Sequence, residues 1–233
     1  MKLSILIPVF NEKETILEIL RRVDMVKLNL EKEIIVIDDC SNDGTTDILR
    51  SLDSQKYKIF STEKNSGKGA AIKVGLKKVS GDIIIIQDAD LEYDPGDYVS
   101  MLGPILDNKV DVTLGSRVLQ NPMKLFGSHR TPVITYMGHA VTTTLINLLY
   151  GQSGTDYYAC YKMFRVKILK DITLEANGFD FDSEFVCKVF KKEIKVVEVP
   201  ISYTPRAKNT GKKIKWHDAF PVIFSIIKWR FVS

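Results

Sequence analysis

The stretch DIIIIQDADLEYDP, residues 82–95, is the part of the chain that best indicates its fold. Four consecutive isoleucines predict a strand buried on both faces, as in a parallel sheet. Carboxyl groups follow at Asp88, Asp90 and Glu92, and they would share one side of the chain if it stayed extended. Such crowded carboxylates repel one another unless a cation lies among them, and Mg²⁺ or Mn²⁺ suits oxygen ligands of this kind. The alternative is a solvated acidic loop.

Strand-like runs alternate with helical patterns on both sides of this stretch. Helices of about 10 to 15 residues between buried strands are typical of βαβ units, so we expect an α/β fold with a mostly parallel sheet. The expected strands are residues 3–9, 33–38, 58–62, 82–87, 111–115, a strand that ends near 165, and 195–200. Later helices are expected at residues 132–151, 179–191 and 216–231, the last with Pro221 in its first turn.

A polar cluster follows each of the first five expected strands. In an open α/β sheet, ligands bind beyond the carboxyl ends of the parallel strands. We therefore expect five segments to converge on one rim and form a ligand site: residues 8–12, 38–45, 65–70, 88–92 and 115–117.

The positive charge of the chain is concentrated near its end. The 233 residues carry a net charge of +4. Residues 206–233 hold seven Lys or Arg against Asp218, a charge of +6, which leaves −2 for the rest. We expect an enzyme domain over 1–205 and a basic amphipathic segment over 206–233 that packs on the domain or on a membrane surface. A phosphorylated ligand or an anionic membrane is favoured over nucleic acid, since no nucleic-acid-binding signature accompanies the charge.

Several other classes of protein are disfavoured by missing motifs. Three cysteines without CxxC spacing favour a reduced, cytosolic setting. We expect no signal peptide, and no apolar run has the length of a membrane span. The sequence NSGKG at 65–69 is not the GxGxxG fingerprint, and Walker A is absent. The three histidines, His129, His139 and His217, show no zinc spacing, and we expect them to have surface or core roles. No Ser or Cys has a base beside it.

Sugar transfer from a nucleoside diphosphate fits the residues that remain. A metal held by the acidic cluster would bridge the phosphates and act as a Lewis acid on the leaving group. Cations at Arg117, Arg206, Lys212 and Lys213 could bind phosphates, although each of them taken alone is better explained as a solvated surface charge. The pair at residues 38–39 could bind ribose or base, or simply cap the following turn.

Seven motifs, in order, resemble those of family 2 glycosyltransferases. PVFNE (8–12), DDCSNDGT (38–45), NSGKGAA (65–71) and DADLEYDP (88–95) carry the family resemblance. GSR (115–117), DYYACYKMF (156–164) and YTPRAKNTGKKIKW (203–216) resemble the polyprenyl-phosphate glycosyltransferases, the group that includes the dolichol-phosphate mannose synthases.

The resemblance implies a GT-A nucleotide-binding fold and an inverting hexose transfer. The donor would be GDP-mannose or a UDP-hexose, and the transferred sugar would be mannose or glucose. The acceptor would be a dolichyl or undecaprenyl phosphate. It implies metal ligands at Asp90 and Glu92 with Asp88 nearby, and Mg²⁺ or Mn²⁺ as cofactor. It gives catalytic roles to Asp90, Arg117 and Arg206. The implied nucleotide-sugar-binding set is Pro8, Phe10, Glu12, Ile37, Asp39, Lys68, Asp88, Ala89, Asp90, Arg117, Arg206 and Lys212.

A lipid-phosphate acceptor agrees with the absence of an evident catalytic base, because a phosphate dianion is already a nucleophile. The helix at 132–151 and the C-terminal segment could lie in a bilayer interface, at the cytoplasmic face, or instead pack on the core or a second copy. One alternative function is transfer to a soluble or polysaccharide acceptor, which would need a base such as Asp156 or Glu184. Another is a nucleotide-sugar-binding protein without chemistry.

Overall fold

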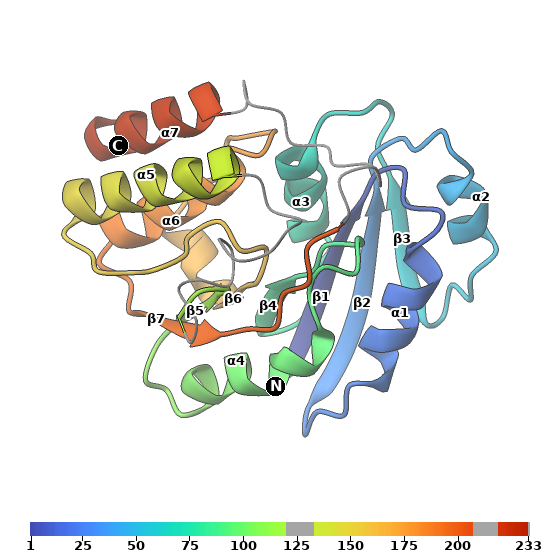
Figure 1. Ribbon diagram of the computed structural model, residues 1–233. Coiled ribbons are helices and arrows are strands. Elements are labelled where there is room, and N and C mark those ends of the chain that lie inside the picture. Colours follow the sequence, from blue (N-terminus) through green and yellow to red (C-terminus); the bar gives the residue numbers. More distant parts are fainter. Residues whose placement is uncertain (120–132, 207–218, 233) are drawn as a thin grey trace.

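The computed structural model describes residues 1–119, 133–206 and 219–232, which form a layered α/β sandwich around one sheet (Figure 1). The sheet order is β3-β2-β1-β4-β6-β5-β7. Its strands are β1 (Lys2–Val9), β2 (Glu31–Asp38), β3 (Tyr57–Ser61), β4 (Ile83–Ile86), β5 (Val112–Ser116), β6 (Lys162–Arg165) and β7 (Val196–Pro200). The predicted α/β class with a mostly parallel sheet is confirmed, and the strand ends differ from the predicted ones by a few residues.

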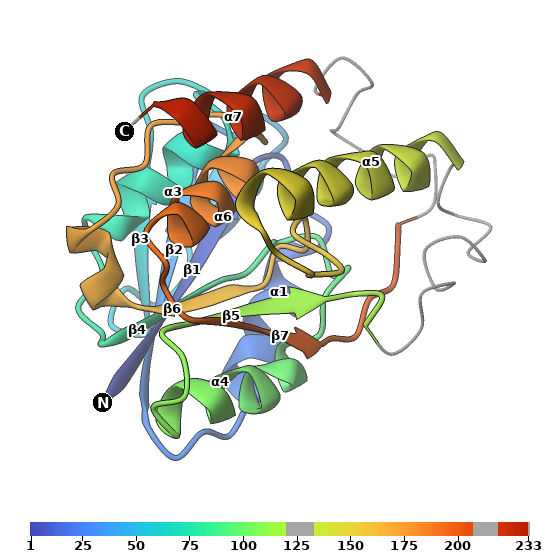
Figure 2. The same cartoon turned by 90° about the vertical axis from the view of Figure 1, so that its left-hand side faces the viewer.

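Helices cover both faces of this sheet. Figure 2 shows α3, α5, α6 and α7 on one side, with α1 and α4 on the other. The helices are α1 (Ile16–Met25), α2 (Thr45–Arg50), α3 (Lys68–Leu76), α4 (Tyr98–Leu106), α5 (Val133–Tyr150), α6 (Phe181–Lys191) and α7 (Ala219–Phe231), with short 3₁₀ turns η1 (Pro95–Asp97) and η2 (Val166–Lys170). Within the described ranges, no helix is both long and apolar enough to cross a bilayer.

The isoleucine strand β4 lies at the centre of the core, as its sequence predicts. All four of its side chains are at most 1% exposed. It pairs in parallel with β1 and antiparallel with β6. Since full burial of an isoleucine contributes about 1.5–3 kcal/mol, this strand anchors the acidic segment that follows it.

Strand β6 is the one antiparallel member among the described strands. It lies between β4 and β5 and runs opposite to both. Two reversals restore the direction, so β5 runs parallel to β4, and β7 runs parallel to β5. The carboxyl end of β5 therefore faces the same edge of the sheet as those of β1, β2 and β4.

Two glycines of the NSGKGAA motif allow α3 to approach the backbone before α6. Gly67 has φ +96°, and a Cβ on Gly69 would lie 2.6 Å from the carbonyl oxygen of Ala176. We predict that Gly69→Ala destabilises the protein by about 1–3 kcal/mol, because backbone cannot move aside as a side chain can. Urea unfolding followed by circular dichroism measures this. Gly103→Ala in α4 is the matched control.

A Cβ on Gly103 would meet nothing within 4 Å. That control should be neutral or up to ~1 kcal/mol more stable, since alanine is the better helix former. Equal unfolding midpoints for the two variants would contradict the proposed close packing.

Candidate active site

The predicted polar segments do converge on one rim of the sheet. Strands β1, β2 and β4 are parallel, and β5 shares their direction. Their carboxyl ends therefore bring the loops that carry Glu12, Asp39, Asp88 and Arg117 to one edge, where α3 also begins with Lys68. Residues 201–206, which follow β7, reach the same edge.

The chain turns directly after β4, so the three carboxylates do not share one side of a strand. The strand ends at Ile86, and Leu91 adopts φ +62°. The carboxylate of Asp90 accepts a hydrogen bond from the backbone N–H of Glu92 at 3.1 Å, which stabilises the turn. The extended arrangement that the alternation of side chains suggested is therefore wrong, and each acidic side chain has different surroundings.

Asp88 forms a buried ion pair with Lys68. The Lys68 ammonium lies 2.8 Å from a carboxylate oxygen of Asp88, and both side chains are less than a quarter exposed. Burial acts to raise the pKa of Asp88, but the charge and hydrogen bond of Lys68, together with smaller contributions from Cys160 and Lys162, lower it. The structure thus brings together two residues of the predicted nucleotide-sugar site.

Glu92 holds the segment that follows β7 against the acidic loop. Its carboxylate accepts hydrogen bonds from the backbone N–H of Arg206 at 2.8 Å and from the hydroxyl of Tyr203 at 3.2 Å. Its carbonyl oxygen accepts from the N–H of Thr204. These bonds fix the position of residues 203–206 relative to Glu92.

Arg206 joins the loops after β1 and β4. Its Nη2 lies 2.5 Å from a carboxylate oxygen of Glu12, and its Nε donates to the carbonyl oxygen of Asp90 at 3.0 Å. Both charged side chains are largely buried, at 16% and 7% exposure. The pair links residues 194 positions apart, which no local sequence pattern could predict.

Asp90 is the carboxyl group whose environment best suits an added cation. Burial, together with the charges of Asp88 and Glu92, raises its pKa to about 7, although Arg206 acts against this. The described residues contain no group of three or more His, Cys, Asp or Glu side chains gathered closely enough to hold a metal ion. A divalent cation beside Asp90 would nevertheless relieve the repulsion among these carboxylates, so the donor chemistry fits one.

Asp39 organises the loop before α3. Its carboxylate accepts from the Thr62 hydroxyl at 2.9 Å and from the backbone N–H groups of Ser66 and Gly67, the latter at 2.7 Å. Asp38 caps the turn after β2 through Ser41 and Thr46. The capping alternative thus describes Asp38, and the nucleoside role of Asp39 stays a prediction.

The apolar members of the predicted nucleotide-sugar set lie at or below the rim. Ile37 is fully buried in β2, opposite Pro8 in β1. Ala89 is 3% exposed, and Phe10 is half-buried. Lys212 and Lys213, together with His129 and His217, lie outside the described residues.

Arg117 is bound edge-on by a carboxylate that sequence reasoning had treated as a possible base. Its Nε and Nη2 donate to the two oxygens of Asp156, at 2.7 and 2.9 Å. His139, from α5, contacts the same carboxylate through Nε2 at 2.9 Å. Burial acts to raise the pKa of Asp156, but Arg117 and His139 hold it below its usual range.

Neither proposed base is placed to activate a soluble acceptor. The side chains of Asp156 and Glu184 are both fully buried. Glu184 accepts from the N–H groups of Glu175 and Ala176 and pairs with Lys188 at 2.7 Å. Both carboxylates therefore stabilise the fold around the rim.

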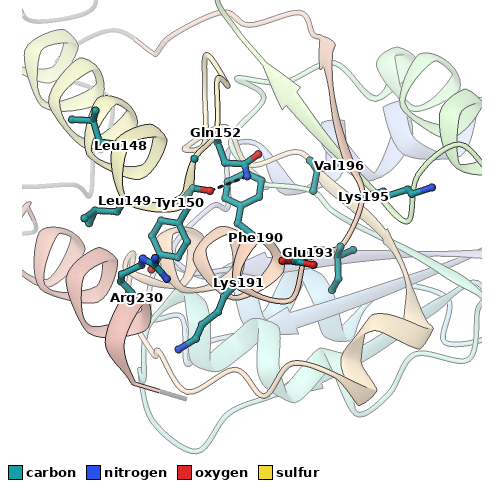
Figure 3. Close-up of a pocket in the computed structure, with 12 residues that line it drawn as sticks. Leu148, Leu149, Tyr150, Gln152, Phe190, Lys191, Glu193, Lys195, Val196 and Arg230 are labelled. Carbon is teal, nitrogen blue, oxygen red and sulfur yellow. Dashed lines mark hydrogen bonds between the residues drawn. The ribbon is translucent and has the colours of Figure 1, made fainter.

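A separate hollow of about 730 Å³ lies away from this rim (Figure 3). It is bounded by the last turns of α5 and α6, by Arg230 of α7, and by Lys195 and Val196 at the start of β7. Since the rim lies beyond the carboxyl ends of the strands, this hollow is not part of the candidate active site.

Comparison with known proteins shows to which family the chain belongs. Residues 4–173 match the model of glycosyl transferase family 2. The chain belongs to glycosyltransferase family 2. It is 30% identical to a dolichol-phosphate mannosyltransferase of Pyrococcus furiosus over 98% of its length, and 25% identical to the low-salt glycan biosynthesis hexosyltransferase Agl6 of Haloferax volcanii over 88%. It spans 64% and 48% of these two relatives' own lengths.

Solved structures with low sequence identity to this chain share its architecture. Glucosyl-3-phosphoglycerate synthase of Mycobacterium tuberculosis, solved with Mn²⁺, UDP and phosphoglyceric acid, matches with a TM-score of 0.74 at 17% identity. The match covers all of this chain and 79% of the other. A second structure of that enzyme, with Mg²⁺ and UDP, gives a TM-score of 0.76. The expected GT-A fold is confirmed.

Proposed function

We propose that this family 2 glycosyltransferase transfers a hexose, mannose or glucose, from a nucleoside diphosphate to a polyprenyl phosphate, with inversion at the anomeric carbon. The observation that carries the proposal is a rim that holds carboxylates together with cations: Asp88, Asp90 and Glu92, and Lys68, Arg117 and Arg206. Such a rim suits a ligand that brings both a divalent cation and phosphates. Similarity to a dolichol-phosphate mannosyltransferase supports the lipid acceptor.

Asp90 and Glu92 would hold Mg²⁺ or Mn²⁺, with Asp88 at the edge of the site. When bound, the metal would neutralise the diphosphate and act as a Lewis acid on the leaving group. Asp88 remains oriented by Lys68, so it adds negative charge near the metal without turning freely. Arg206, which pairs with Glu12, would stabilise the negative charge that develops on the departing diphosphate.

The acceptor phosphate would attack without help from a base. One of its oxygens forms a bond to C1 while the bond between C1 and the diphosphate oxygen breaks, and the nucleoside diphosphate leaves with the electron pair. A phosphate dianion carries no proton on the attacking oxygen. The protein therefore contributes alignment and charge stabilisation, and the transition state has oxocarbenium character. The engaged carboxylates of Asp156 and Glu184 agree with this.

A donor and acceptor screen tests the function. The protein is incubated with labelled GDP-mannose, UDP-glucose or UDP-N-acetylglucosamine, with Mg²⁺ or Mn²⁺, and with polyprenyl phosphate. We expect label to enter the chloroform-soluble fraction with one donor and to vanish when EDTA removes the metal. Transfer to a water-soluble acceptor without lipid would instead favour the alternative acceptor class. Donor binding by calorimetry without turnover would favour a binding protein.

The outer surface of α5 and α7 suits a membrane carrying the lipid acceptor. Apolar residues recur at spacings of three, four or seven on each helix, and each is 44–77% exposed. We call this set the apolar face: Met137, Val141 and Leu148 on α5, and Phe224, Ile227 and Phe231 on α7. Figures 1 and 2 show the two helices side by side on the outside of the molecule.

The charges around the apolar face favour an anionic bilayer as its occupant. Helix α5 contains no Lys, Arg, Asp or Glu, and the last turn of α7 carries Lys228 and Arg230. The inner side of α7, with Ile226 and Trp229, is buried on the domain. Helix α7 would thus both pack on the domain and meet the membrane, peripherally at its cytoplasmic face.

We predict that the double variant Phe224→Glu/Phe231→Glu loses at least about tenfold in partition onto vesicles of phosphatidylglycerol and phosphatidylcholine. Each phenylalanine transferred out of water contributes about 1.5–3 kcal/mol, and added carboxylates are repelled by anionic lipid. Vesicle sedimentation measures the partition. Val99→Glu, at a site on α4 that is 58% exposed, is the control and should bind as the parent does. Unchanged sedimentation of the double variant would exclude this face as the membrane contact.

A further inference from the structure

The carboxylate of Asp156 accepts the hydrogen bonds that set the orientation of Arg117. Besides the two guanidinium bonds, its Oδ2 accepts from the backbone N–H of Arg117 at 3.0 Å. Its Oδ1 also accepts from the backbone N–H of Tyr158 at 3.1 Å. Side chain and backbone of Arg117 are therefore fixed by one group that is fully buried.

Arg117 keeps capacity for an anion while it is held in this way. A guanidinium has five N–H donors, and two of them are given to Asp156. The carbon of the guanidinium lies 5.1 Å from the centre of the Tyr203 ring, so its face is supported as well. The side chain remains 13% exposed at the rim. The guanidinium is therefore held at one edge by Asp156 and on one face by Tyr203, and its other N–H groups can bind an anion.

His139 extends this support to α5. The carboxylate of Asp156 stays ionised and can only accept, so the imidazole Nε2 must carry the proton in their 2.9 Å contact. The ring is largely buried and lies 6.3 Å from the Tyr158 ring, edge to face. Met137 and Val141 of the apolar face lie two residues to either side of His139 on the same helix.

We propose that Asp156 and His139 are positioning residues that orient Arg117 toward phosphate groups bound at the rim, and that they connect this cation to the helix bearing the apolar face. This inference rests on the proposed function. Arg117 would be the group that touches a phosphate, and the other two act through it. Because α5 carries both His139 and half of the apolar face, the position of α5 on a membrane would bear on the orientation of Arg117.

Two substitutions at His139 separate positioning from folding. His139→Gln keeps an N–H donor that can reach Asp156, whereas His139→Leu has similar bulk and no donor. We expect His139→Leu to weaken phosphate binding about tenfold, seen in the Kd for GDP or UDP with Mg²⁺ by calorimetry or in the KM for polyprenyl phosphate. The kcat should change less than KM, since the lost interaction orients a binding group. His139→Gln should stay within about twofold of the parent.

Asn147→Leu is the matched control on the same helix. Asn147 also ties α5 to the segment on both sides of Asp156, through the backbone of Gly154 and the hydroxyl of Tyr157. Its loss should lower the melting temperature but leave Kd and KM near the parent values. Asp156→Asn should weaken binding at least as much as His139→Leu, because a neutral amide cannot accept both guanidinium bonds.

The outcomes distinguish the positioning role of Asp156 and His139 from the proposed function on which it rests. A parent protein that binds nucleotide but transfers no sugar to lipid would refute the proposed function. The comparison of Kd values would still show whether Asp156 and His139 position Arg117. If His139→Leu leaves both Kd and KM unchanged, or if Asn147→Leu raises them equally, Asp156 and His139 only stabilise the fold and the inference is overturned.

Discussion

Replacing Asp90 by alanine should lower sugar transfer about 10³-fold. Its carboxyl group lies between Asp88 and Glu92 in a half-buried turn, and its pKa of about 7 reflects burial and the repulsion of these neighbours. A bound cation would convert this repulsion into attraction. Loss of a charge-stabilising group at the leaving diphosphate removes several kcal/mol, and each 1.36 kcal/mol is tenfold in rate. Initial rates with the donor chosen by the screen measure the effect.

A second measurement separates the metal role of Asp90 from damage to the fold. We expect the parent protein to bind its nucleoside diphosphate more tightly with Mn²⁺ than without, and Asp90→Ala to lose this difference. Asp94→Ala is the control: Asp94 is exposed and caps Gly96 at the start of η1. It should retain both activity and the Mn²⁺ dependence. Wild-type turnover by Asp90→Ala would remove Asp90 from the metal site.

Elements that are specified by local sequence were predictable here. Four buried isoleucines identified β4, and Phe181, Phe185 and Val189 of α6 are all buried as their helical spacing predicts. The helix α4 was not predicted, because Pro104 lies inside it, although its buried residues recur at helical spacing: Tyr98, Met101, Leu102 and Ile105. The antiparallel direction of β6 was also missed, since it depends on pairing with strands distant in sequence.

The residue types of the active site were predictable, but their geometry was not. The order of the strands predicted that the five loops meet. The turn at Leu91 was not foreseen, because a leucine with positive φ has no sequence signal. His139 was expected to have only a surface or core role. Its contact with Asp156 arises from the packing of α5, which no spacing in the sequence encodes.

Replacing Arg206 by alanine is expected to have the second-largest effect, about 10²–10³-fold in kcat/KM. The guanidinium links Glu12 to the backbone of Asp90, so its removal takes away a cation beside the diphosphate and leaves Glu12 buried without that partner. Arg206→Lys should recover part of the activity, since an ammonium supplies charge but not the two-sided geometry. Steady-state kinetics with each variant provide the measurement.

Glu12→Gln distinguishes the direct role of Arg206 from its anchoring. That variant keeps the bond between the Arg206 backbone and Glu92 at 2.8 Å, and it keeps the positive charge while weakening its anchor. If Arg206 acts on the diphosphate itself, Glu12→Gln should lose much less activity than Arg206→Ala. Equal losses would mean that the ion pair serves mainly to hold the loops after β1 and β4 together. The charge stabilisation would then have to come from the metal and from Arg117, because these are the remaining positive groups that the proposed mechanism places on a phosphate.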